Sequence, residues 1–106
     1  MFLAEAHGLS ILEEAKQIRV PNVIYAADEF IVLEEVSSAP RQHDYWEQFG
    51  AQLAALHSCH GPSYGFERDN YCGSSPQSNL RSEDGYEFFA EQRLLFQARM
   101  AVDNRA

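Results

Sequence analysis

Residues 30–36 read FIVLEEV, and this stretch decides how the rest of the chain is interpreted. Five of its seven residues are apolar and favour β-structure, so it predicts a buried strand. Glu34 and Glu35 interrupt the apolar run near its end, and the Ser-Ser-Ala-Pro of residues 37–40 is typical of a loop. The strand therefore leads into a linker. Both an ordinary core strand followed by a loop and a strand that connects two lobes fit these residues.

The bulk composition describes a small, acidic, globular protein. The chain has 106 residues, enough for one small domain, and its hydrophobic content of 45% is typical of a folded chain. It has 16 acidic residues against 8 Lys and Arg, which gives a formal net charge of −8. This balance argues against a nucleic-acid partner, because binding to a phosphate backbone depends on Lys and Arg.

The sequence shows neither a membrane span nor a secretion signal. No apolar run approaches the length that a bilayer requires. The N-terminal residues lack the basic start and the small-residue cleavage site of a signal peptide. Two cysteines, Cys59 and Cys72, do not form a disulfide framework. We therefore expect a cytoplasmic, reducing setting and no membrane partner.

The residues before the strand predict a helix and a hairpin. Apolar residues at helical spacing favour an amphipathic helix over residues 2–18, which Val20-Pro21 ends because a residue before proline disfavours helical geometry. Val23–Ala26 is predicted to pair with Phe30–Val36 through a tight turn at Asp28-Glu29. Two strands alone are marginal in water, and no further strand is convincing, so we expect the hairpin to belong to a larger sheet.

The residues after the strand predict two helices around a long loop. Asp44, with a glutamate three residues later, resembles a capping box, and residues 44–58 repeat apolar side chains at helical spacing. Residues 59–81 are predicted to be an ordered loop, because their central part is rich in turn formers and shows little periodicity. Ser82 or Asp84 is expected to cap a last helix that reaches about residue 102.

Metal binding and nucleophilic chemistry have weak support. His57, Cys59, His60 and Cys72 could supply the nitrogen and sulfur ligands that zinc prefers, but they lack the paired spacing of a zinc finger or ribbon. A Cys–His nucleophile is equally weak, because adjacency in sequence does not create a dyad. No glycine-rich phosphate loop occurs in these 106 residues. We therefore predict no metal site, and a small His/Cys metal-binding protein is the least favoured alternative.

Several motifs, in their order along the chain, resemble the fructosamine kinase (ketosamine kinase) family. The first helix resembles FxxEAxGL, residues 30–34 resemble the hinge strand FLVME or FLVMD, and residues 50–57 resemble GxQLAxLH. The most specific matches are DNxxGxxPQxN over residues 69–79 and FFAEQRL over residues 88–94. The resemblance covers essentially the whole chain and about the middle third of a family member.

The resemblance implies an α+β architecture that is part of an aminoglycoside-phosphotransferase-like, protein-kinase-like fold. Residues 1–36 would be a partial N-lobe, with one helix and two strands ending in the hinge. Residues 37–106 would start the C-lobe with a helix, the ordered loop 59–81 and another helix. The strand FIVLEEV would then be the hinge strand, whose backbone hydrogen-bonds an adenine.

The resemblance also assigns roles to single residues. Glu34 and Val36 would meet the adenine edge of ATP through a backbone C=O and N–H, and Leu33 would be the gatekeeper beside it. Glu5 resembles the helix glutamate that pairs with a strand lysine, and no residue is assigned a catalytic step. ATP and Mg²⁺ are implied for full-length members, with a ketoamine (a glycated amine) as the substrate.

Two departures from the family pattern shape the functional expectation. The family's nucleotide loop and strand lysine would precede Met1, and its catalytic HGDLWxxN segment would follow Ala106. Arg81 and Gly85 stand where the family usually has tryptophans. We therefore expect ATP-dependent phosphorylation of a ketoamine hydroxyl from the full-length protein, and no activity from this chain alone. The alternative is a non-catalytic interaction module derived from the kinase scaffold, and exposed apolar faces favour a homo-oligomer.

Overall fold

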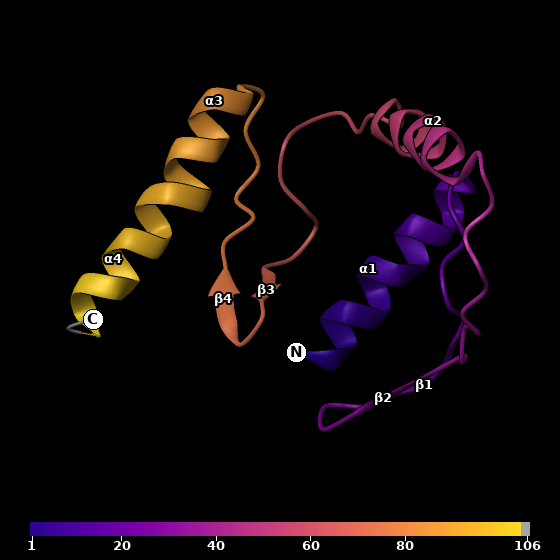
Figure 1. The fold of residues 1–106 in the computed structure, drawn as a ribbon. Helices are drawn as coiled ribbons and strands as arrows, with labels where there is room; N and C mark the ends of the chain where they lie inside the picture. Colours follow the sequence, from indigo (N-terminus) through magenta and orange to yellow (C-terminus); the bar gives the residue numbers. More distant parts are fainter. Residues whose placement is uncertain (105–106) are drawn as a thin grey trace. The chain divides into compact units, whose positions relative to one another are not determined.

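The computed structural model describes residues 1–104 and contains helices and short antiparallel hairpins (Figure 1). The chain divides into two compact units, Met1–His60 and Gly61–Ala106. The sequence predicted a lobe boundary after Val36, whereas the units separate after His60. The assignment of residues to kinase lobes stays a prediction.

The first unit begins with helix α1, Phe2–Ala15, which packs against the hairpin that follows it. The helix ends at Ala15 and not at residue 18, so the predicted boundary was wrong. The reason is local: Lys16 adopts a left-handed conformation with φ 53°, and its N–H donates to the Glu13 carbonyl at 3.0 Å. Such a left-handed residue closes a helix by bonding one of its last free carbonyls.

The predicted hairpin is present as β1, Val23–Ala26, and β2, Ile31–Leu33. The turn is tight, because the Ala27 N–H donates to the Phe30 carbonyl at 2.9 Å across the expected Asp28-Glu29 pair. Strand β2 is shorter than the predicted Phe30–Val36. The pairing nevertheless continues beyond the strand's end, where the Glu34 N–H donates to the Asn22 carbonyl at 2.8 Å.

Helix α2, Tyr45–His57, confirms the helix predicted over residues 44–58. The capping box is wrong, however, because the Asp44 side chain caps no backbone N–H. Its carboxylate instead accepts from the Gln48 side chain at 2.6 Å. The start of the helix carries Tyr45, Trp46 and Phe49, whose rings contact one another, and the Arg41 guanidinium lies over the first two.

The second unit contains a hairpin where the sequence predicted only loop. Strands β3, Asn70–Cys72, and β4, Ser75–Gln77, pair in antiparallel register. Gly73 begins the two-residue turn with φ 62°, a conformation that glycine adopts without steric cost. A bridge between Tyr64 and Ser82, with hydrogen bonds of 2.9 and 3.2 Å, joins the two chain segments that flank the hairpin.

A long helical segment ends the described chain. It consists of α3, Gly85–Phe88, the π-helical η1, Phe89–Leu95, and α4, Phe96–Asp103. Of the two predicted caps, Asp84 is the one used: its Oδ1 accepts from the backbone N–H groups of Tyr86 and Glu87 at 2.8 and 3.1 Å. The π-helical stretch was not predicted.

Within residues 1–104, no hydrophobic side chain is fully buried, and the one buried polar residue is Asn79, at 4% exposure. Large apolar side chains such as Ile24, Trp46 and Leu80 are mostly exposed. No helix in this part of the chain is long and apolar enough to cross a membrane. Polar contacts, rather than an apolar core, therefore organise the site described next.

Candidate functional site

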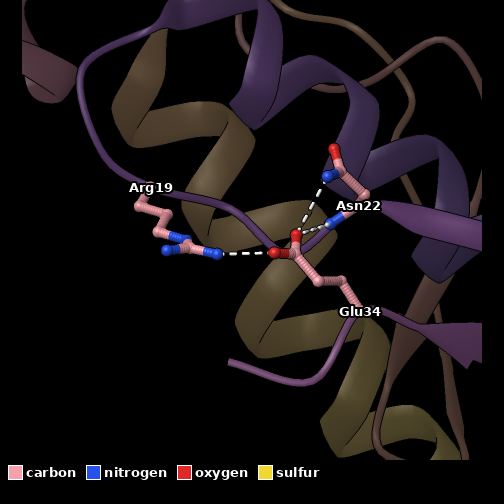
Figure 2. A network of polar contacts seen from close by, with 3 residues as sticks. All are labelled: Arg19, Asn22 and Glu34. Carbon is pink, nitrogen blue, oxygen red and sulfur yellow. Dashed lines mark hydrogen bonds and ion pairs between the residues drawn. The ribbon is translucent and has the colours of Figure 1, made fainter. Parts of the chain in front are cut away.

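The first candidate site lies at the end of β2, where Glu34 joins two segments of the chain (Figure 2). One carboxylate oxygen, Oε2, accepts from the Asn22 backbone N–H at 3.1 Å and from the Asn22 side-chain amide at 2.9 Å. The other oxygen, Oε1, accepts from Arg19 Nη2 at 2.5 Å. With the backbone bond from Glu34 to the Asn22 carbonyl, four hydrogen bonds tie the connector between α1 and β1 to the end of β2.

These contacts change the acidity of Glu34. The hydrogen bond from the Asn22 backbone N–H and the neighbouring Arg19 guanidinium lower the pKa of the Glu34 carboxyl below its ordinary value of 4.5, although desolvation opposes them. Glu34 is therefore a carboxylate at neutral pH. Because the Arg19 side chain is 67% exposed, its ion pair with Glu34 is screened by solvent and contributes little. The Asn22 bonds are the firmer part of this site.

The other residues predicted to face a nucleotide lie beside this network. Leu33 ends β2 and is half-buried, and Val36 is 49% exposed. Within residues 1–104, neither the Glu34 carbonyl nor the Val36 N–H takes part in a backbone hydrogen bond. Adenine binding at these groups stays a prediction.

Glu5, predicted to pair with a lysine, lies in the first turn of α1 and is exposed. No ion pair of Glu5 occurs among the residues that the structure describes. Its position near the helix N-terminus favours a negative charge, since the helix dipole is positive there. This is sufficient to explain a glutamate at this position, and the lysine partner stays a prediction.

The second candidate site, which sequence reasoning missed, is a polar network around Asn79. The Asn79 amide donates to the Arg68 carbonyl at 3.0 Å and to Asn70 Oδ1 at 2.9 Å, and its Oδ1 accepts from Arg93 Nη2 at 2.6 Å. The Asn79 backbone N–H donates to Asp69 Oδ1 at 2.8 Å. All the polar atoms of one buried side chain are thereby paired, as burial requires.

The π-helical η1 supplies the other half of this network. Arg93 also donates to the Ser78 carbonyl and lies over the Phe88 ring at 4.5 Å, and Gln92 accepts from the Ser78 hydroxyl at 2.7 Å. Partial burial lowers the pKa of Arg93, which remains protonated because guanidinium groups do so in proteins. Single π-helical turns are frequent at functional sites. Here the π-helical turn places two successive side chains, Gln92 and Arg93, against Ser78, the residue that follows β4.

An open hollow lies beside Asn79. It measures about 720 Å³ and is lined by the segments around Arg68 and Arg81. Both arginines are exposed, and the acidic residues Glu67 and Asp69 line the same hollow. The charges of the lining therefore balance, and the hollow favours no ligand class by charge. One signal for this region was present in the sequence, namely Gly-Ser between two short segments, which is typical of a hairpin turn.

The histidines and cysteines singled out as possible metal ligands form no metal centre within residues 1–104. Among the residues that the structure describes, no three His, Cys, Asp or Glu side chains are placed to hold a metal ion. Cys59 and Cys72 are free and exposed. The Cys59 thiol donates to the Ala55 carbonyl at 3.6 Å within its own helix end. The metal-binding alternative therefore has no geometrical support.

The structure also explains one departure from the expected family pattern. A Cβ atom placed on Gly85 would lie 2.6 Å from Tyr64 Cζ, so the Tyr64 ring occupies the space beside this glycine. The ring stacks on Phe88 with 6.3 Å between centroids. A large side chain at position 85 would displace this ring. The structure offers no comparable explanation for Arg81.

The comparisons with known proteins cover all or nearly all of the chain. A sequence model of the family described as fructosamine kinase matches residues 1–106. A protein of Synechocystis named as a ketoamine kinase is 39% identical over 106 residues, which are 95% of this chain and 36% of that protein. The chloroplastic protein-ribulosamine 3-kinase of Arabidopsis thaliana is 37% identical over 110 residues, which cover 97% of this chain and 33% of that protein. The chain spans about a third of the length of these curated relatives.

Solved structures agree with the sequence matches. A crystal structure of a protein named as a fructosamine-3-kinase, from Haemophilus somnus, matches with a TM-score of 0.85 at 28% identity, over 98% of this chain and 37% of that chain. A similarly named protein of Thermobifida fusca matches with a TM-score of 0.84 at 37% identity, over 98% of this chain and 36% of that chain. The predicted α+β fold is therefore confirmed at this level, as the fold of about a third of such a protein.

Proposed function

The chain belongs to the fructosamine kinase family, and we propose that it supplies the hinge and adjoining helices of a kinase that phosphorylates ketoamines. The full-length protein would transfer the terminal phosphoryl group of ATP to a hydroxyl of a sugar-derived ketoamine. The observation that carries this proposal is that the sequence model of the family matches the chain over its full length, residues 1–106. Relatives named as ketoamine and ribulosamine kinases support the substrate class.

In this proposal, residues 33–36 bind the adenine. The Glu34 carbonyl would accept from the adenine amino group and the Val36 N–H would donate to the ring, while Leu33 would pack beside the base. Glu5 would pair with a lysine contributed by another part of the full-length protein. Mg²⁺ would accompany the phosphates of ATP, and we assign none of its ligands to these 106 residues. Phosphoryl transfer depends on positioning and on charge from a lysine and a metal ion, so the chain alone would be inactive.

The experiment that tests the proposal uses a hybrid kinase. Residues 1–106 would replace the matching third of the Thermobifida fusca relative, and phosphate transfer from ATP to a synthetic fructosamine would be measured. We expect activity in the hybrid and none in the purified 106-residue chain. An inactive but folded hybrid would refute the proposed function, and activity of the 106-residue chain would refute the assignment of the catalytic groups to other parts of the protein.

One observation favours a second candidate function, an interaction module without catalysis. No hydrophobic side chain within residues 1–104 is buried, and many large ones are exposed. Such faces are covered by a partner or by another copy in a protein that acts by binding. The hybrid kinase distinguishes the two functions: an inactive, folded hybrid, together with a stable stoichiometric oligomer of the purified chain in sedimentation, supports the module.

The proposed location is a reducing, cytoplasmic setting. Both cysteines, Cys59 and Cys72, are free thiols in the structure, which suits such a compartment. One relative is named as chloroplastic, so the location within a plant-type cell would be a separate question. Fractionation of cells that express the tagged protein tests this part of the proposal.

A further inference from the structure

We propose that Glu34 is a positioning residue for the nucleotide: its side chain, bonded to Asn22 and Arg19, fixes the backbone that would face the adenine. The inference rests on the proposed function and deepens it, because it assigns a role to a side chain where only the backbone was expected to act. Figure 2 shows the three residues and the contacts on which it rests.

The geometry around Asn22 is reciprocal. Asn22 donates through its backbone N–H and its side-chain amide to the Glu34 carboxylate, and accepts the Glu34 N–H at its own carbonyl. The backbone of residue 34 is thus held on the N–H side and through its side chain. Its carbonyl, one peptide unit further, is the group proposed to meet the adenine. A fixed position for this carbonyl lowers the cost of ordering it when a ligand binds.

The end of β2 needs such a tether. The strand has three residues, and Val36 and the following segment to residue 40 are exposed. A segment with so few contacts is otherwise free to move, since local order depends on packing and hydrogen bonding. The Glu34 carboxylate bonds Asn22, 12 residues earlier in the chain, and these side-chain bonds hold the end of β2 where strand pairing has stopped.

The two partners of Glu34 contribute unequally. Hydrogen bonds to a charged group are stronger than neutral ones, and the Asn22 backbone N–H is a fixed donor that needs no side-chain ordering. Arg19 is exposed and must order a long side chain to reach the carboxylate. We therefore expect the contact with Asn22 to dominate, so that glutamine at position 34, which keeps an acceptor oxygen, retains part of the function.

The first test uses the complete 106-residue chain and nuclear magnetic resonance. The amide signals of Asn22 and Glu34 are expected to follow the titration of the Glu34 carboxyl in wild-type protein and in Arg19→Ala, and to lose that titration in Glu34→Gln. Glu34→Ala is expected to shift the Val36 amide signal and increase its mobility. Glu35→Ala, which removes the adjacent exposed carboxylate, is the matched control: it shifts the Val36 signal as a direct neighbour but should leave the mobility of the Val36 amide unchanged. If Glu34→Ala leaves the mobility of the Val36 amide as unchanged as Glu35→Ala does, the inference is overturned.

The second test measures kinetics in the hybrid kinase. Glu34→Ala is expected to raise the KM for ATP about tenfold, Glu34→Gln about threefold and Arg19→Ala less than about twofold, with kcat and the KM for the fructosamine unchanged. A purely structural role would instead lower the amount of active enzyme and leave the KM for ATP as it was. An active hybrid in which Glu34→Ala keeps the wild-type KM for ATP overturns the inference alone. An inactive, folded hybrid refutes the proposed function, and the magnetic resonance test then decides the tether separately.

Discussion

Replacing Asn79 with alanine should disorder the second unit, because this residue holds its parts together. The substitution removes three side-chain hydrogen bonds, one of them from the charged Arg93. Net contributions of about 1 kcal/mol for each neutral bond and about 2 kcal/mol for the charged one give a loss of about 3–4 kcal/mol, reduced where water reaches the freed partners. Since no apolar side chain in residues 61–104 is fully buried, little else offsets that loss.

The measurement is hydrogen exchange of backbone amides in the 106-residue chain. The Tyr64 and Ser82 amides, which bond across the bridge that flanks the hairpin, report on the unit as a whole. A loss of about 3 kcal/mol corresponds to exchange that is about a hundredfold faster in Asn79→Ala. Asn104→Ala, which removes the same side chain from an exposed helix end, is the matched control and should leave these rates unchanged.

A second variant tests the orientation of the Asn79 amide. Asn79→Asp keeps the shape and the pairing with Arg93, but it places a carboxylate oxygen against the Arg68 carbonyl and Asn70 Oδ1, which are both acceptors. We therefore expect Asn79→Asp to exchange faster than wild type, although its carboxylate gains an ion pair with Arg93. If Asn79→Ala exchanges at the rate of Asn104→Ala, or if the wild-type amides show no protection, the argument that this network organises the unit is refuted.

Three further predictions concern Gly65, Glu34 and the exposed apolar side chains. Gly65→Ala should lower the free energy of unfolding by about 2–4 kcal/mol, because Gly65 has φ 103° and a Cβ there would lie 2.8 Å from the Asn79 carbonyl oxygen. Gly85→Ala should lower it less, because the Tyr64 ring that the new Cβ meets is exposed and can move. Chemical denaturation compares the two variants, and equal midpoints would contradict the argument. Because folding lowers the pKa of Glu34, this residue stabilises the fold fully above the ordinary pKa of 4.5, and the stabilisation is lost as the pH falls through the lower pKa of the folded state. The end of β2 in the wild-type protein should therefore lose order only in that acidic range. Glu34→Gln should show no such step, and amide exchange measures both. The exposed apolar side chains should make the chain associate with rising concentration, and a monomer at all concentrations in analytical ultracentrifugation would exclude the predicted oligomer.

Apolar periodicity identified the elements whose residues interact within one segment. The helix over Tyr45–His57 and the hairpin of β1 and β2 were found because spacing and turn residues are local signals. The second hairpin escaped because its strands have three residues each and include Pro76, so they show neither alternation nor β-branched residues. The π-helical stretch was not predicted, because it inserts an extra residue into a helical repeat and so departs from the α-helical spacing on which the prediction rested.

The two candidate sites could not be predicted from spacing because their partners are distant in sequence. Glu34 meets Asn22 and Arg19 across 12 and 15 residues, and Asn79 meets Arg93 across 14. Each network joins an asparagine to a carboxylate and an arginine: Asn22 to Glu34 and Arg19, and Asn79 to Asp69 and Arg93. Each also contains a backbone N–H that donates to the carboxylate, and an arginine contact that depends on charge. Salt should therefore weaken the exposed Arg19 contact and leave the half-buried Arg93 pairing largely intact, since screening acts mainly on exposed charges. It follows that added salt should affect the end of β2 more than the hairpin beside η1, although the Asn22 bonds, which dominate at Glu34, should persist.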